Sequence, residues 1–210
     1  MIVCGIDPSL SSTGIAFYDT KKKKLYSGCI KTDPSKGFAK GFEPLFSLAL
    51  RVAEYIKKHK PKIIAIEHPI FYNGHIRGAM RVIYFHALLR CVIYQNHKKS
   101  ELYEYWPTAW KKKFTGNGHS TKEQVMKTAL SRYRYKFLNS DQADAFGIMR
   151  AAFSDYRIAK LLKQQSGGDE KGAETNIESM QRSGIVQTAD ENELLVYRKV
   201  KKRIFRKRPA

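Results

Sequence analysis

The chain has 210 residues, of which 42% are hydrophobic, and this is enough for one compact domain with a sizeable core and a tail. Its net charge of +20 is an excess that an enzyme of small neutral substrates does not need, and it favours nucleic acid over an anionic membrane surface as partner. Three scattered cysteines exclude a disulfide scaffold, and no apolar run reaches the about 20 residues of a membrane span, so we expect a soluble, cytoplasmic protein.

The first part of the chain predicts three strands joined by short polar links, which is typical of an antiparallel meander. We expect these strands at residues 2–7, 14–18 and 25–30. A helix follows over 42–59, because its apolar residues recur at helical spacing and basic residues gather at its end.

The second part alternates between strands and helices. We expect strands at 63–67 and 101–105, and helices at 76–95, 121–133 and 141–162. Ser120 is expected to cap the 121–133 helix, with Glu123 completing a capping box. The whole order predicts an α/β fold with a mixed five-stranded sheet and helices on both of its faces.

Composition divides the chain into three regions. Residues 1–163 carry the strands and helices, and we expect them to form one domain. Residues 164–193 are rich in polar residues and nearly free of aromatics, which is typical of a flexible linker. Residues 194–210 form a basic tail, with eight Lys or Arg between Arg198 and Arg208.

Four acids occupy positions that can converge. Asp7 ends the first strand and Glu67 the fourth, while Asp141 and Asp144 share one face at the start of a helix. Singly, each has an ordinary interpretation as a turn residue, an exposed strand end or a helix N-terminal acid. Together they would repel one another unless cations neutralise them, and carboxylate oxygens select Mg²⁺ or Mn²⁺.

The expected 76–95 helix has two apolar stripes where a surface helix shows one. The first stripe contains Ile76, Met80, Ile83, Ala87, Cys91 and Tyr94, and the second contains Val82, Phe85, Leu89 and Val92. One stripe would pack on the sheet. The other favours a twofold-related copy as its partner, or else burial inside a monomer.

Several segments, taken in order and spacing, resemble the motifs of the RuvC family of Holliday junction resolvases between about residues 2 and 155. They are Gly5-Ile6-Asp7-Pro8-Ser9 with Gly14, then Ala65-Ile66-Glu67, the glycine-rich segment 116–125, and Gln142-Ala143-Asp144-Ala145 with Asp141 ahead of it.

This resemblance implies a ribonuclease H-like fold, a homodimer, and paired nicks across four-way DNA junctions with two Mg²⁺ ions per active site, for which Mn²⁺ would substitute. It matches Asp7, Glu67, Asp141 and Asp144 to the family's metal-binding acids and Lys122 to its catalytic lysine. The DNA-binding residues that we expect are Lys111, Lys112, Lys113, Gly116, Gly118, His119, Phe71, Tyr72 and Arg77.

Two departures from the family pattern affect this assignment. Ser9 stands where the family has a glycine, and Phe71 follows Glu67 by four residues rather than three. The base-probing role therefore stays open between Phe71 and Tyr72. The extension after residue 163 and the high lysine content are similar to phage-encoded relatives, so a bacterial or a phage-infected cell is the expected setting.

Three other functions are compatible with parts of the sequence. A ribonuclease H-type enzyme that cuts RNA–DNA hybrids would share the fold and the acids. A branch-binding protein without chemistry would not need all four acids, which are present here. A basic membrane-surface protein would need an amphipathic basic helix, and residues 1–155 contain none.

Overall fold

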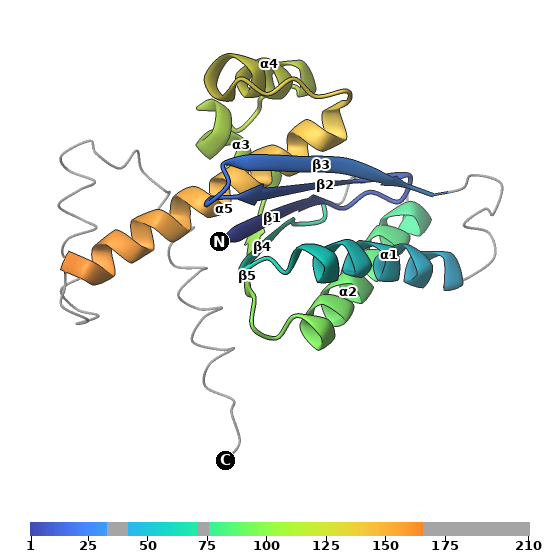
Figure 1. Cartoon of the computed structure of the whole chain (residues 1–210). Coiled ribbons are helices and arrows are strands. Elements are labelled where there is room, and N and C mark those ends of the chain that lie inside the picture. The colour runs from blue at the N-terminus through green and yellow to red at the C-terminus, as the bar shows by residue number, and fades with distance from the viewer. Residues whose placement is uncertain (33–41, 71–75, 166–210) are drawn as a thin grey trace. The chain divides into compact units, whose positions relative to one another are not determined.

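The computed structural model describes residues 1–32, 42–70 and 76–165, and residues 1–155 form one compact unit (Figure 1). Its five strands are β1 (Ile2–Asp7), β2 (Ser12–Asp19), β3 (Lys24–Lys31), β4 (Ile63–Glu67) and β5 (Glu101–Tyr105). They form one sheet in the order β3-β2-β1-β4-β5. β1, β2 and β3 pair antiparallel, and β4 pairs parallel to both β1 and β5, so the predicted mixed sheet is confirmed.

One face of the sheet packs against α1 (Glu43–His59), on which α2 (Ile76–Asn96) lies. Side chains alternate along a strand, so Cys4 and Ile6 of β1 point into this layer. There they join buried residues of α1 such as Leu48 and Val52, which lie on one side of the helix because of their spacing. This layer forms a hydrophobic core between the sheet and the helices α1 and α2.

The opposite face of the sheet is covered by residues 140–155 of α5 (Ser140–Gln165), as Figure 1 shows. Two glycines let the helix approach closely. A Cβ at Gly5 would lie 2.1 Å from the carbonyl oxygen of Ala145, and a Cβ at Gly14 would lie 2.1 Å from that of Asp141. The start of α5 is therefore held directly against β1 and β2.

Two short helices complete this side, α3 (Pro107–Thr115) and α4 (Lys122–Tyr133). The helix α3 was not predicted from the sequence. Pro107 stands in its first turn, where a missing N–H costs nothing, and Gly116 ends it with a left-handed φ of 92°. Its fully buried Trp110 packs over Gly147 of α5, where a Cβ would meet the indole ring at 2.6 Å.

The predicted cap of α4 was wrong by one residue. Thr121 caps the helix by accepting from the N–H of Gln124, whose side chain accepts in turn from the N–H of Thr121. Ser120 is instead buried and donates to the carbonyl of Asn117. A capping box needs a hydroxyl residue and an acid or amide three residues later. Ser120 with Glu123 and Thr121 with Gln124 both fit this pattern, and the burial of Ser120 selects the second pair.

The expected linker begins at residue 164 and the expected basic tail at residue 194. Apart from residues 164 and 165, which belong to α5, both segments lie outside the described residues. The described helices include none that combines the length and the apolar character needed to cross a bilayer.

Candidate active site

Two of the four acids meet because of strand register. β1 and β4 run parallel with Ile6 opposite Ile66, so Asp7 and Glu67 follow side by side at the ends of their strands. Since Ile6 and Ile66 belong to the core on the α1 side, the next residue of each strand points toward α5. The two carboxyl groups lie within hydrogen-bonding reach of each other.

The other two acids come from the first turns of α5. The backbone of Asp141 rests on Gly14, which is the partner of Asp7 across the β1–β2 ladder. One turn later Asp144 is only 7% exposed. Asp7 interacts electrostatically with both Asp141 and Asp144, so the structure brings all four acids to one end of the sheet.

Three of the four acids have raised pKa values. Burial is the largest cause for Asp7, Glu67 and Asp144. The carboxylate of Glu67 further raises the pKa of Asp7, which stands well above its ordinary value. Burial, together with repulsion by Asp7, raises the pKa of Asp144 to about 7. Such a cluster is unfavourable when fully ionised and without a neutralising cation.

Two lysines supply part of the missing positive charge. The ammonium group of Lys122, at the start of α4, lies 3.8 Å from a carboxylate oxygen of Asp141, and its side chain is 61% exposed. Lys111 of α3 lies near enough to Glu67 and Asp144 to lower the pKa of both. Both lysines therefore stand beside the acids.

Sequence reasoning missed Trp110 as a part of this site. Its indole lies close enough to Glu67 to lower the pKa of that carboxyl. Its buried Nε1 nevertheless makes no hydrogen bond of full geometry within the described part of the chain. Finding this contact from the sequence would have required the helix α3, which places Trp110 and Lys111 in successive positions facing the acids.

Known proteins match this chain over its whole described domain. The family profile of crossover junction endodeoxyribonuclease RuvC matches residues 3–150. RuvC of Brachyspira hyodysenteriae is 30% identical over 166 residues, which span 78% of this chain and 100% of that protein. RuvC of Rickettsia bellii is 33% identical over 70% of this chain and 94% of that protein. The chain belongs to the RuvC family.

The fold agrees with this membership. The structure of Thermus thermophilus RuvC has a TM-score of 0.60 and 24% identity, and covers 76% of this chain and 97% of that chain. The structure of the T. thermophilus RuvC in complex with Holliday junction substrate has a TM-score of 0.62 and 25% identity over 76% of this chain and 96% of that chain. The predicted ribonuclease H-like fold of this RuvC family member is thereby confirmed.

The remaining residues that the RuvC resemblance singled out do not all reach the acids. Lys113 turns elsewhere, because its ammonium group pairs with Asp155 at 3.2 Å. Lys112 and His119 are exposed, and Gly116 and Gly118 lie in the turn that joins α3 to α4. Phe71 and Tyr72 fall outside the described residues. Arg77 lies in the first turn of α2, where the structure does not describe its side chain.

The acidic cluster of this RuvC family member suits divalent cations. A carboxylate oxygen of Asp144, Oδ1, is buried without a hydrogen-bond partner in the described residues, although such an oxygen normally has one. The donor set consists of hard oxygen atoms, which Mg²⁺ and Mn²⁺ prefer. As the side chains stand, no three Asp, Glu, His or Cys of the described ranges surround a common point as a preformed metal site.

Proposed function

We propose that this chain is a metal-dependent endodeoxyribonuclease that resolves four-way DNA junctions by paired nicks. The observation that carries the proposal is the convergence of Asp7, Glu67, Asp141 and Asp144 at one end of the sheet in a RuvC family chain. The likeness to a relative solved with Holliday junction substrate supports the choice of DNA. Relatives that match it are bacterial, which supports action in a bacterial cytoplasm or in a phage-infected cell.

The four acids would hold two Mg²⁺ ions, with Mn²⁺ as a substitute. Asp7 stands between Glu67 on one side and α5 on the other, so it is the acid best placed to serve both ions. When bound, two such ions activate the attacking water and stabilise the leaving 3′ oxygen. The carboxyl groups themselves only hold and orient, which explains why acids rather than His or Cys make up the site.

The chain's lysines would position the scissile phosphate. Lys122 is exposed and anchored near Asp141, so its ammonium group can turn toward a phosphate without leaving the site. Lys111 approaches the acids from α3. Trp110 closes the site from the core side, because it is fully buried beside Glu67.

Residues next to this centre would bind DNA more widely. The α3–α4 turn exposes Gly116 and His119 beside Lys122. This turn and the start of α4 therefore offer backbone amides and a positive side chain to phosphates. Contacts to phosphates position DNA without reading its sequence. We assign Lys112 and Gly118 to the same surface, and assign the contacts to bases to Phe71 or Tyr72, with Arg77 nearby in sequence.

A homodimer accounts for paired nicks. One stripe of α2 is buried, with Phe85 and Leu89 fully inaccessible. The other is open, with Met80 39% and Tyr94 72% exposed. An exposed apolar stripe on a helix favours a partner, and a twofold-related copy would place two active sites on one junction.

The test is digestion of a labelled panel with Mg²⁺, containing a four-way junction, a three-way junction, a flap, an RNA–DNA hybrid and a linear duplex. We expect paired nicks in the four-way junction. Asp7→Asn should bind the junction and not cut it, because Asn keeps the shape and loses the charge that holds metal. Preferred cutting of the hybrid would support the ribonuclease H alternative. Binding without cutting by the unmodified chain would support a non-catalytic branch binder.

A further inference from the structure

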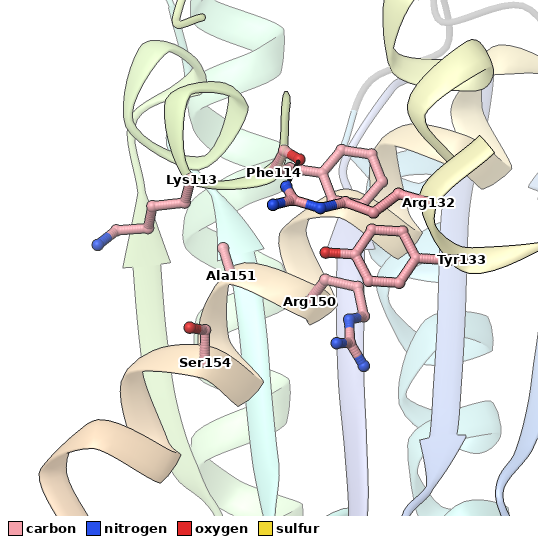
Figure 2. Close-up of a pocket in the computed structure, with 7 residues that line it drawn as sticks. All are labelled: Lys113, Phe114, Arg132, Tyr133, Arg150, Ala151 and Ser154. Carbon is pink, nitrogen blue, oxygen red and sulfur yellow. Dashed lines mark hydrogen bonds between the residues drawn. The ribbon is translucent and has the colours of Figure 1, made fainter. Parts of the chain in front are cut away.

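A second basic site lies on the α5 side of the sheet, in an open pocket of about 350 Å³ (Figure 2). Three helices contribute to it: α3, α4 and α5. The residues that line it are Lys113, Phe114, Arg132, Tyr133, Arg150, Ala151 and Ser154. Three of these seven are cationic, and none is acidic. The pocket therefore has the charge of an anion site.

Arg150 is held in place by aromatic rings. Its guanidinium group lies 4.6 Å from the ring centre of Tyr133 and 5.4 Å from that of Phe153. Stacking of this kind fixes the plane of a guanidinium and leaves its N–H edges available. Its Nε is buried, and no described residue accepts a hydrogen bond from it. A buried donor without an acceptor is unfavourable, and an anionic ligand would supply the missing acceptor.

The wall behind Arg150 is rigid. Tyr133 stacks on Phe114 with ring centres 5.3 Å apart and an interplanar angle of 5°. Both rings meet Phe146 edge-on. Figure 2 shows the guanidinium groups of Arg132 and Arg150 on either side of the Tyr133 ring. Arg150 is thus presented by a packed aromatic cluster, whereas Arg132 is an exposed side chain held by a hydrogen bond to the carbonyl of Phe114.

The three cations are not equivalent. Lys113 pairs with Asp155 at 3.2 Å, and Figure 2 shows it extending away from both arginines. Arg132 donates from one nitrogen to the carbonyl of Phe114 at 3.2 Å, near the end of α3. The pocket lining contains no acid that could pair with the charge of Arg132. The pocket's effective charge therefore comes from Arg132 and Arg150.

A simpler explanation covers only part of this arrangement. Basic residues near helix C-termini are stabilised by the helix dipole, and Lys113 and Arg132 stand in the last turns of α3 and α4. Arg150 lies in the middle of α5, far from either end of that helix. The dipole thus gives no reason for its buried and unpartnered Nε.

The pocket is separate from the acidic cluster. Arg150 follows Asp144 by six residues, which is a rise of about 9 Å along α5 and a rotation that places the two on different sides of the helix. An anion in the pocket therefore cannot be the phosphate held by the acids and Lys122. It must belong to another nucleotide or to another molecule.

We propose that this pocket binds a backbone phosphate of the DNA, at a point away from the scissile phosphate. The inference rests on the proposed function, because that function supplies the DNA. Two guanidinium groups, that of Arg150 on the rigid wall and that of Arg132 beside it, fit phosphate oxygens in charge and hydrogen-bonding capacity. Such a contact would orient a DNA arm on the α3–α4–α5 side and add to affinity without taking part in the reaction.

The experiment measures junction binding by the full chain without divalent metal, by fluorescence anisotropy over a series of salt concentrations. Each phosphate contact contributes about 0.9 to the slope of log K against log salt. Arg132→Gln combined with Arg150→Gln should lower the slope by about that amount, and affinity at 0.1 M salt by about eight-fold. Cutting at saturating junction should stay unchanged, because neither residue touches the reacting phosphate.

Two control proteins separate a built site from general charge. Lys127→Gln combined with Lys136→Gln removes two exposed charges outside the pocket and should change the slope by much less. Arg150→Lys keeps the charge but loses the planar fork, and should show a measurable part of the loss. Thermal unfolding of every variant checks the fold. If Arg150→Gln unfolds the chain, Arg132→Gln alone serves as the test variant, because it changes an exposed residue.

Four outcomes would overturn the proposal. An unchanged slope and affinity in the folded double variant means that DNA does not enter the pocket. A control protein that loses as much slope and affinity as the double variant leads to the same conclusion. Stabilisation by millimolar inorganic phosphate that the double variant abolishes, with junction affinity unchanged, would assign the pocket to a small free anion. If the unmodified chain binds no junction, the proposed function fails as well, which separates that failure from failure of the pocket alone.

Discussion

The acidic residues at the end of β1 and β4 have opposite effects on folding and on chemistry. Buried carboxyl groups with raised pKa values resist ionisation, and neighbouring carboxylates raise the pKa values of Asp7 and Asp144 further. A cation relieves this repulsion, so the energy stored in the metal-free cluster becomes affinity for metal. The same residues therefore weaken the empty fold and create the site.

Asp144 makes this argument measurable. Its pKa is about 7 in the fold and about 3.8 when exposed in an unfolded chain. A raised pKa contributes stability that is complete below the lower value and is lost as pH rises through the higher one. The metal-free protein should therefore lose stability relative to Asp144→Asn between about pH 4 and 8, by on the order of 4 kcal/mol.

The measurement is the difference in Tm between the two proteins across that pH range, in chelator. Mg²⁺ at pH 8 should then raise the Tm of the unmodified protein more than that of Asp144→Asn. A Tm difference that stays constant with pH would show that Asp144 does not titrate in this window.

Gly14 tests how closely α5 must approach the sheet. A Cβ at this position would lie 2.1 Å from the carbonyl oxygen of Asp141, so Gly14→Ala must push the start of α5 outward. We expect a loss of about 1–3 kcal/mol in unfolding free energy, the usual cost of overpacking. Junction cutting should fall further than stability alone explains, because Asp141 and Asp144 move away from Asp7.

Gly28→Ala is the matched control, since a Cβ there meets no described atom within 4 Å. It lies in β3 of the same sheet and should leave cutting unchanged. Chemical denaturation and single-turnover cutting of a labelled junction give the two readouts. Equal behaviour of the two variants would contradict the close-approach argument.

At the scale of elements, α2 shows why a helix can carry two apolar stripes. Phe85 and Leu89 are buried toward α1 and the sheet, while Ala87 and Cys91 are exposed. The sequence predicted both stripes but could not say which one faces outward, because a helix pattern is unchanged by rotation about its axis. The packing of α1 on α2 settles the direction.

The open stripe predicts a dimer that one charge disrupts. Ile83 lies on this stripe and is half-buried, so Ile83→Glu should give monomers without unfolding the chain. Such monomers should lose the coordination between nicks on opposite strands. Sedimentation and the ratio of paired to single nicks are the measurements.

Leu130→Glu, which places the same charge at a 51% exposed residue of α4, should remain a dimer. An unmodified chain that sediments as a monomer at micromolar concentration would disprove this interface.

The elements that sequence reasoning found and missed differ in length and periodicity. β4 and β5 were predicted with their observed bounds, since each is a short run between clear breaks. α3 was missed because nine residues with three consecutive lysines show little apolar periodicity. That omission also concealed Trp110 beside Glu67. The four acids needed no such help, because strand ends and a helix start define where they lie.

At the scale of the whole molecule, positive charge exceeds what the described active site uses. The chain carries 39 Lys and Arg against 19 Asp and Glu. Eight of those basic residues lie between Arg198 and Arg208, beyond the described residues. Charges of this kind raise affinity for any DNA without choosing among shapes, whereas junction selectivity requires two active sites at a fixed spacing. Affinity and selectivity should therefore be separable by truncation.

Truncation after Gln165 tests this separation. All of the described β-strands and helices remain in the shortened chain, so the fold and the cutting of bound junctions should be intact. Binding should weaken to a similar degree for junction, flap and linear duplex. Each lost phosphate contact should lower the slope of log K against log salt by about 0.9, and three to five contacts would reduce affinity at moderate salt by about ten- to a thousand-fold. Anisotropy titrations over a salt series measure both quantities.

An unchanged slope would instead assign the removed segment to a protein partner. A loss of junction preference at constant overall affinity would assign it to shape recognition.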